Sequence, residues 1–357
     1  MQNLDEKEWK HFRMPEIFGL IQRGKRLKNA DHVPGIVPYV SSTANNNGVD
    51  DYIEATPGTR AFGDCISLAN SGSVGTAFYE PFEYVASDHV TALKTEGMSK
   101  YVYLFLIATI EKQGSNFNFN REINDARIKN MQIMLPVDDA GEPDYAYMAE
   151  YVQQKRAAML DKYHKYVEAR IAELGELIEI PMLDEKEWDE FFIGDLFEVS
   201  RPKSRNKDDY DFGNTPFVAS GALNNGVMKC CDAKQDEQLD AGNCITVSPV
   251  DGSTFYQPMD FLGRGGAGSS ILMLRSDWLN LYLGQFIART VRQTCSKYTY
   301  GHMGNKDSIK RERIMLPIDD SGKPDYEYME QYAKNMMLRK YKQYLEFVNR
   351  QNVTEVD

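Results

Sequence analysis

The chain has 357 residues, with 53 acidic against 41 basic side chains, which gives a formal net charge of −12 at pH 7. This length is enough for two or three domains, and a composition of 42% hydrophobic and 26% charged residues is typical of a soluble globular protein. No run of 18 apolar residues occurs and the first ten residues are polar and acidic. We therefore expect neither a signal peptide nor a membrane span, and we expect a cytoplasmic protein.

The five cysteines are odd in number and lack C-x-x-C spacing, so the sequence predicts neither a disulfide framework nor a zinc site. Cys65 and Cys244 occupy matching positions in two apolar runs, which predicts buried thiols in a reducing compartment. We expect no metal and no cofactor. The net negative charge taken alone argues against nucleic acid, but phosphate contacts depend on local Lys and Arg, so the distribution of charge matters more.

The chain begins with a segment that it later repeats. LDEKEW occurs at Leu4–Trp9 and again at Leu183–Trp188. The two tryptophans correspond, as do two phenylalanines nine residues further on, and we predict that these aromatic residues lie in the core at the start of a small sheet. They are Trp9, Trp188, Phe18 and Phe197.

A polar, basic loop follows in each copy, with the sequences QRGKRLK and SRPKSRNK. Such a loop is compatible with a solvated surface, and its functional interpretation is contact with phosphate groups. We align Arg26 with Arg205, and Lys28 with Lys207. The candidate residues are Arg23, Lys25, Arg26 and Lys28 in the first copy, and Arg201, Lys203, Arg205 and Lys207 in the second.

Short β-branched and aromatic runs come next, separated by turn residues, and they predict that each copy is mostly β. PYVSSTANNNGV matches PFVASGALNNGV, and Asn-Gly is a strong signal of a hairpin turn. A base-reading role for the asparagines is the secondary interpretation. GRGGAG at Gly263–Gly268 fits a nucleotide-binding pattern, but it leads into a strand-like segment, so we predict a loop. The asparagine candidates are Asn46, Asn47, Asn224 and Asn225.

An apolar helix is then predicted in each copy, from Tyr101 and from Leu279, and a loop that mixes aromatic and basic residues follows it. From Arg289 to Arg313 the second copy carries a net charge of +5. Phe117 and Phe119 match Tyr298 and Tyr300. We expect one aromatic residue of each pair to anchor the loop to the core, and the others to contact phosphates and base edges. The candidates are Phe119, Arg121 and Arg127 in the first copy, and Lys297, Tyr298, Tyr300, His302 and Lys306 in the second.

Each copy ends in the same hinge. Ile133–Met148 reads IMLPVDDAGEPDYAYM and Ile314–Met329 reads IMLPIDDSGKPDYEYM, at an offset of 181. Pro and Gly break a strand there, and the Asp after the second Pro can cap the long helix that follows. Apolar residues recur along both helices at three- and four-residue steps, which predicts a coiled-coil seam with Met159, Leu174, Met336 and Leu345 buried in it.

This order of segments resembles the specificity (S) subunit of type I restriction–modification enzymes. The residues that carry the resemblance are the two LDEKEW segments, the NNGV turns, KYTYG…IKRERIMLP, and the two IMLP-to-helix junctions at Pro136 and Pro317. It implies an α+β fold with two similar β-rich target recognition domains and two long helices in an antiparallel coiled coil. The expected parts are domains at 1–142 and 181–323, and spacer helices at 143–180 and 324–357.

The resemblance further implies a non-catalytic subunit that reads one half of a bipartite site on double-stranded DNA with each domain. The implied partners are methyltransferase subunits, two in number, and restriction or translocase subunits through the complex, without a membrane. Related S-like subunits serve type IIB-like enzymes, and the sequence leaves that alternative open. A spacer helix of about 30 residues spans ~45 Å, so the half-site centres should lie about one turn of DNA apart or slightly more.

Two other classes of function are compatible with a chain of this length and composition. An enzyme is disfavoured because the chain has no Asn-Pro-Pro-Tyr-like motif, and Asp-x-Lys, which starts at Asp5, Asp184 and Asp232, lacks the Pro-Asp partner of a nuclease site. An orphan or structural repeat protein of the same fold, which binds proteins and does not read DNA by itself, remains the alternative.

Overall fold

The computed structural model describes residues 3–114, 116–117, 121–266 and 268–354, with side chains described up to Arg350. Two units make up the chain, Met1–Tyr163 and His164–Asp357. The division falls inside the long helix α4 (Tyr145–Leu174), so the last part of this helix belongs to the second unit. Among the described residues, no helix combines the length and apolar character that crossing a bilayer demands.

The first unit consists of three small sheets and a covering helix, α2 (Lys100–Gly114). In one sheet the order is β2 (Leu20–Arg23), β9 (Val90–Lys94), β6 (Cys65–Ala69), β7 (Ala77–Glu80). In the next the order is β4 (Val49–Ile53), β3 (Pro34–Val40), β8 (Tyr84–Ala86), β5 (Ala61–Phe62). The third sheet pairs β1 (Trp9–Arg13) with β10 (Gln132–Pro136), and the short helices are α1 (Met14–Ile17) and α3 (Asp125–Asn130).

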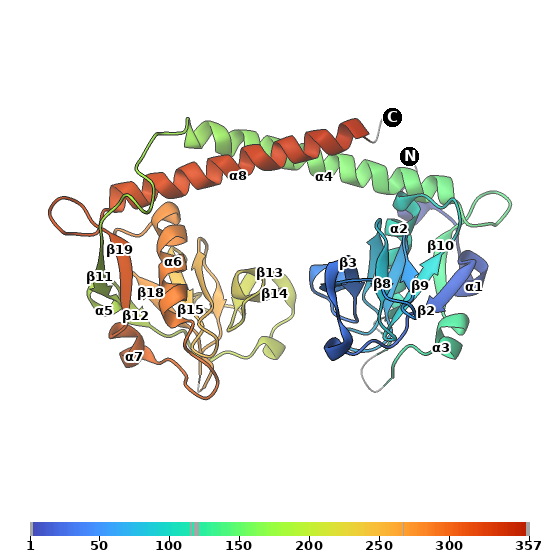
Figure 1. Ribbon diagram of the computed structural model, residues 1–357, viewed down its shortest axis with the longest axis horizontal. Coiled ribbons are helices and arrows are strands. Elements are labelled where there is room, and N and C mark those ends of the chain that lie inside the picture. Colours follow the sequence, from blue (N-terminus) through green and yellow to red (C-terminus); the bar gives the residue numbers. More distant parts are fainter. Residues whose placement is uncertain (1–2, 115, 118–120, 267, 355–357) are drawn as a thin grey trace. The chain divides into compact units, whose positions relative to one another are not determined.

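The second unit repeats this order almost strand for strand. Figure 1 labels several strands of both units. Its four-stranded sheet has the order β12 (Glu198–Ser200), β18 (Leu272–Arg275), β15 (Cys244–Val247), β16 (Thr254–Gln257). The next sheet has the order β14 (Val227–Cys231), β13 (Phe212–Val218), β17 (Leu262–Gly263). The third sheet pairs β11 (Trp188–Phe192) with β19 (Arg313–Pro317). Its helices are α5 (Ile193–Leu196), α6 (Leu281–Cys295), α7 (Lys306–Lys310) and α8 (Tyr326–Thr354). The predicted internal repeat of a β-rich unit followed by a long helix is confirmed.

The repeated hinge is held by the repeated first segment. In the first unit Asp144 accepts a hydrogen bond from the Tyr147 backbone N–H, and thereby caps α4, while Lys7 Nζ lies 2.7 Å from its other oxygen. Asp325, Tyr328 and Lys186 repeat this arrangement, again with a 2.7 Å ion pair. The predicted cap is therefore present in both units, and LDEKEW recurs because its lysine bonds the capping aspartate.

The core of the first unit lies between α2 and the sheet β2-β9-β6-β7. The core of the second unit lies between α6 and the sheet β12-β18-β15-β16. Phe18 and Phe197 are buried there, as predicted. The prediction for Trp9 and Trp188 is corrected, because both residues are half-buried. Trp9 packs against the edge of the core, and Trp188 stacks on Phe286. Each indole N–H donates to a backbone carbonyl of its own LDEKEW segment, which holds the ring at the surface.

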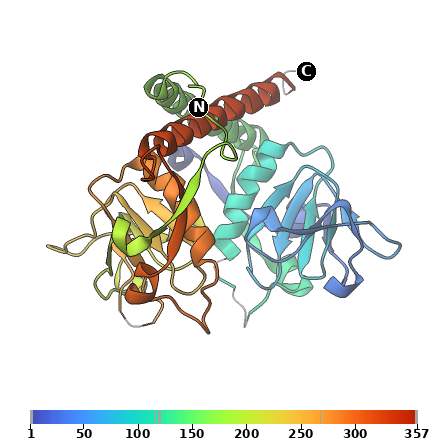
Figure 2. The same ribbon diagram turned by 60° about the vertical axis from the view of Figure 1, so that its left-hand side comes forward.

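The end of α4 runs antiparallel to α8 within the second unit. The Tyr166 hydroxyl lies 3.4 Å from that of Tyr341, whereas the Ile178 amide, further along the chain, bonds Asn335, nearer the start of α8. Figure 2 shows α8 in red across the top of this unit. The four-part division at residues 142, 180 and 323 stays a prediction.

The predicted seam differs in detail. Met159 is 72% exposed, since the side chains of α4 that pack on the first core end at Val152. Leu174, Met336 and Leu345 are half-buried and not fully buried.

Candidate nucleic-acid interface

The basic loop of the first unit leaves β2 at Arg23, whose side chain points back to the unit. The Arg23 Nε lies 3.2 Å from Asp125, and its guanidinium also donates to the Ile123 carbonyl. Since Ile123 and Asp125 belong to the segment after α2, Arg23 joins the two candidate loops of this unit. The exposed cations of the loop are Lys25, Arg26 and Lys28.

The aromatic and basic loop after α2 carries two exposed arginines. The Arg121 guanidinium lies 5.4 Å from the centre of the Phe117 ring, which packs against the core. Arg127 donates to the Glu122 carbonyl, and its own amide is capped by Asn124. Phe119, the other aromatic candidate, lies outside the described residues. Phe117 is thus the anchoring aromatic of this loop, and Arg121 and Arg127 are its surface cations.

In the second unit Arg205 is buried, and the expectation that it contacts phosphate is corrected. Its side chain is 2% exposed and lies 2.7 Å from Glu237 and 2.6 Å from Asp240. The guanidinium also donates to the carbonyls of Gly263 and Gln238, so its hydrogen-bonding capacity is used inside the protein. Burial alone raises the pKa of Glu237, but the hydrogen bonds from Arg205, Tyr210 and the Lys234 amide, together with the positive charge of Arg205, hold that pKa below its ordinary value.

The strand register also corrects the alignment of the two basic loops. Ile21 pairs with Leu93 and Val199 pairs with Leu274, and these partners are 181 residues apart, the offset of the repeat. Counted from these strands, Arg205 corresponds to Leu27 and not to Arg26. Leu27 packs against an apolar cluster that contains Tyr39, so the same place is apolar in one unit and charged in the other.

The remaining cations of the second basic loop are exposed, and a further one lies beside them. Arg201, Lys203 and Lys207 reach the surface, and Ser204 forms a parallel bridge with Gly265. This bridge brings in exposed Arg264, which the sequence analysis missed. Arg264 belongs to the GRGGAG segment, whose first residue ends strand β17; the described residues after it form no helix, and β18 follows them. Its place among glycines was the only signal in the sequence, because its proximity to the basic loop arises in the fold.

The Asn-Asn-Gly segments form turns in both units, as the primary interpretation predicted. Asn46, Asn47, Asn224 and Asn225 all have positive φ values, and each turn connects two antiparallel strands. The Asn225 side chain donates to the Tyr256 carbonyl and to Gln257, so it fixes the turn to β16. The side chain of Asn225 is therefore engaged within the protein, while the four residues are exposed at the surface.

The loop after α6 separates an anchor from an exposed set. Tyr298 is 2% exposed, and its hydroxyl donates to Glu312, so its predicted DNA contact is corrected. Burial and the Glu312 carboxylate raise the pKa of Tyr298. Tyr300 is 79% exposed, and His302 and Lys306 also reach the surface. The expectation of one anchor in this pair is confirmed, and Figure 1 shows the loop at the end of the unit opposite α8.

Lys297 and Lys306 differ in their surroundings. Lys297 Nζ lies 2.6 Å from Glu312, although its side chain is largely exposed. Lys306 opens α7, whose N-cap Asn305 accepts hydrogen bonds from two backbone amides. The exposed Tyr300, His302 and Lys306 thus stand on a loop fixed at both ends, by Tyr298 on one side and by Asn305 on the other. Such a surface offers cations and ring faces, which suit phosphates and base edges.

Comparison with known proteins agrees with the duplicated architecture. The family described as "Type I restriction modification DNA specificity domain" matches residues 6–179 and again residues 185–346. A curated relative, the "Type II restriction enzyme BgcI specificity subunit S.BcgI" of Heyndrickxia coagulans, is 25% identical over 303 residues. The aligned part covers 84% of this chain and 85% of the relative.

Solved structures give a weaker likeness. The type I restriction–modification S subunit from M. genitalium matches with a TM-score of 0.47 and 12% identity, over 99% of this chain and 96% of that one. The HsdS subunit from Thermoanaerobacter tengcongensis matches with a TM-score of 0.31 and 15% identity, over 96% and 91% of the two chains. At these TM-scores the likeness supports no further statement about this chain.

Proposed function

Because the chain belongs to the family of type I restriction modification DNA specificity domains, and is the non-catalytic specificity subunit of a restriction–modification system, we propose that it reads a bipartite DNA site. Each unit addresses one half-site on double-stranded DNA, and the chain docks methyltransferase subunits. The observation that supports this most is a duplicated scaffold whose exposed basic and aromatic loops differ between the units. Internal repetition is a common route to two half-sites on a duplex.

Two kinds of contact are proposed for the loops. The exposed cations of the basic loops, Lys25 and Arg26 in the first unit and Arg201 and Lys203 in the second, contact phosphates and set affinity. The exposed side chains of the loops after α2 and α6, such as Arg121, Tyr300 and Lys306, add contacts to base edges and set sequence preference.

The arrangement of the parts is likewise a proposal. The target recognition domains occupy residues 1–142 and 181–323, and the spacer helices 143–180 and 324–357 set the half-site separation. Helix α4 has 30 residues, and such a helix spans ~45 Å, about one turn of DNA or slightly more. The assembly takes two methyltransferase subunits and, through the complex, restriction or translocase subunits, and it works in the cytoplasm.

Methylome sequencing of a strain that carries Lys306→Ala tests the division of labour. The methylated motif should change in one half-site only, and the other half-site should keep its bases. A change in both half-sites, or an unaltered motif, would contradict the proposed role of the loop after α6. The orphan alternative predicts something else: the wild-type chain together with its methyltransferase subunit would then show no sequence preference in a gel-shift on random DNA.

A further inference from the structure

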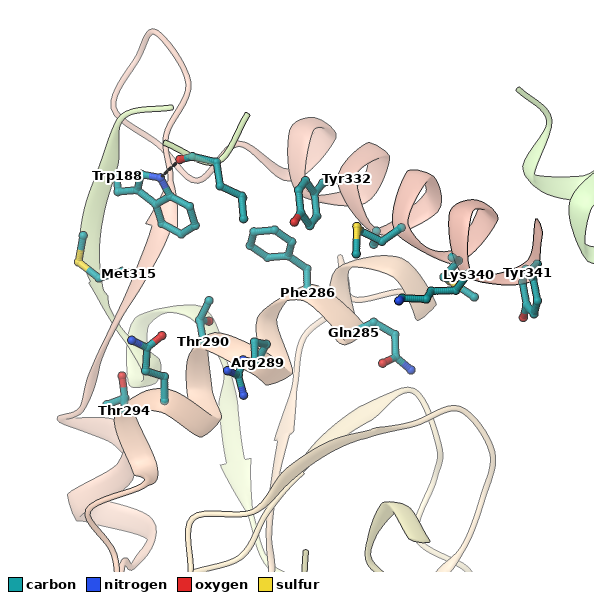
Figure 3. A pocket seen from close by; sticks show the side chains of 15 residues that line it. Trp188, Gln285, Phe286, Arg289, Thr290, Thr294, Met315, Tyr332, Lys340 and Tyr341 are labelled. Carbon is teal, nitrogen blue, oxygen red and sulfur yellow. Dashed lines mark hydrogen bonds between the residues drawn. The ribbon is translucent and has the colours of Figure 1, made fainter. Parts of the chain in front are cut away.

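The second unit contains a large apolar groove on the side of α6 that faces away from its sheet. The groove encloses about 1020 Å³ and is lined by α6, the first part of α8, the LDEKEW segment and β19. Figure 3 shows Trp188, Phe286 and Tyr332 turned toward one another across it. Trp188 stacks on Phe286 with ring centres 6.3 Å apart, and Phe286 meets Tyr332 edge-on at 5.5 Å.

The first unit repeats this groove with corresponding side chains. Trp9 stacks on Phe105 at 6.2 Å, and Phe105 meets Tyr151 edge-on at 5.9 Å. The first groove is smaller, about 480 Å³, and it is lined by the corresponding segments: α2, the first part of α4, the first LDEKEW segment and β10. The DNA-facing loops diverge between the units, whereas these surfaces agree, so the two grooves suit the same partner.

A methionine on each two-stranded sheet shows that the groove is a surface and not an extension of the core. Along β19, Ile314 and Leu316 point into the core, so the intervening Met315 points to the opposite face, where it is 44% exposed. On β10, Met134 holds the matching position and is 41% exposed. Alternation would place a polar residue there, and an exposed apolar residue in both copies marks a contact surface.

The charge of the lining points to the kind of partner. Acidic residues outnumber basic ones by 53 to 41 in the chain. The described residues that line either groove nevertheless include no Asp or Glu, and they include Arg289 and Lys340 in the second unit and Lys112 in the first. An apolar floor with a cationic rim is complementary to an amphipathic helix that carries acidic residues beside its apolar face.

We propose that each groove binds one acidic amphipathic helix of a methyltransferase subunit, so that the two grooves recruit two copies of the same subunit. This inference rests on the proposed function, which includes the docking of such subunits. The flexible Met134 and Met315 side chains, next to the aromatic rings, form the floor on which the apolar face of the helix packs.

The test uses the full chain co-purified with the methyltransferase subunit of the same system, and native mass spectrometry counts the subunits bound. Wild type should bind two, Met315→Glu and Met134→Glu one each, and the double variant none. Since both methionines lie on the solvent face of a strand, the melting temperature should stay that of wild type. Met259→Glu, at a residue 59% exposed and outside the groove, is the matched control and should bind two.

The outcomes separate the inference from the proposed function. If wild type and the double variant both bind two subunits, the groove is not the docking site, although the proposed docking stands. If wild type binds none, the docking itself is refuted, and the groove assignment with it. A chain that dimerises alone and loses the dimer in the double variant would identify a second copy as the occupant and would overturn the proposal.

A second variant tests the positive charge on the rim of the groove and leaves strand β19 unchanged. Arg289→Glu with Lys340→Glu reverses the rim of the second groove at two exposed helix positions. Subunit affinity at that site should fall at least tenfold at low salt, and the difference should shrink as salt rises, because exposed charges are screened. Equal affinity at low salt would contradict an acidic partner helix.

Discussion

A buried arginine in the second unit takes the place that a leucine holds in the first. Arg205 bonds Glu237, Asp240 and two backbone carbonyls, whereas Leu27 packs on an apolar cluster, at the same distance along the chain from the paired strands. The hinge and the groove, by contrast, are alike in both units. The units therefore agree at the hinge and at the groove, and they differ in the interior residues that support the basic loops.

A second exchange of this kind lies on the neighbouring sheet. Gln257, near the end of β16, donates to the Asn225 carbonyl and to Thr246. Glu80 ends β7 at the corresponding place and accepts a hydrogen bond from Ser67, while its other oxygen, Oε2, has no protein partner among the described residues. Burial raises the pKa of the Glu80 carboxyl. The turn of the second unit is thus fixed by a neutral amide, whereas the first unit has a titratable carboxyl at the matching end of β7.

Replacement of Arg205 by alanine should have the largest effect on this comparison. It leaves the half-buried Glu237 and Asp240 carboxylates without the buried cation that they share, so the free energy of unfolding should fall by about 3–5 kcal/mol. Denaturant unfolding of the purified chain measures it. Leu27→Ala is the matched change in the first unit, where only apolar contacts of a half-buried side chain are lost. A smaller loss for Arg205→Ala than for Leu27→Ala would contradict the buried ion-pair network.

Exchange of the two sheet residues should come next. Gln257→Glu removes the two donors that hold Asn225 and Thr246, and it should lower stability by about 1–3 kcal/mol at pH 7. Glu80→Gln should instead stabilise the first unit at that pH. The comparison would fail if both substitutions shifted the melting temperature in the same direction.

Glu80 also predicts a pH dependence. Its folded pKa is raised, so its contribution to stability is fully present below the unfolded pKa and decreases as pH rises toward the folded pKa. The free energy of unfolding, measured at pH values from the unfolded pKa to the folded pKa of Glu80, should show this decrease in wild type. Glu80→Gln should abolish the decrease. An unchanged slope in the variant would mean that Glu80 does not titrate on unfolding.

Tyr300 and Tyr298 sharpen the division between recognition and support. Tyr300→Ala removes a side chain that is 79% exposed, so the free energy of unfolding should change by less than ~0.5 kcal/mol. The free energy by which the protein discriminates between half-sites should change by ~1–3 kcal/mol per base pair. Tyr298→Ala removes a buried anchor and should destabilise the unit. Quantitative binding to variant half-sites, together with melting curves, separates the two effects.

The smallest expected effect concerns a single phosphate contact. Lys203→Ala in the second unit, or Lys25→Ala in the first, should weaken binding to all sequences alike and reduce the salt slope of log K by about one unit. Binding titrations at several salt concentrations measure this slope. A loss confined to one DNA sequence would instead assign the lysine to base recognition.

Local sequence determined the repeat, the hinges and the turns. Asn-Gly requires positive φ values, Pro and Gly end a strand, and an aspartate before a helical run caps it, so each of these features depends on residues within a few positions. The hairpins and the caps at Asp144 and Asp325 were predictable for that reason.

Tertiary structure decided which side chains are available at the surface. Arg205 and Lys203 look equivalent in the sequence, and Arg205 is buried only because Glu237 and Asp240, more than 30 residues away, meet it in the fold. The groove is assembled from four separate segments, and the LDEKEW tryptophan joins it because its N–H is bonded locally while its ring stacks on α6. The exposure of a side chain and the shape of the groove depend on contacts between residues distant in the sequence, and these contacts cannot be predicted from periodicity along the chain.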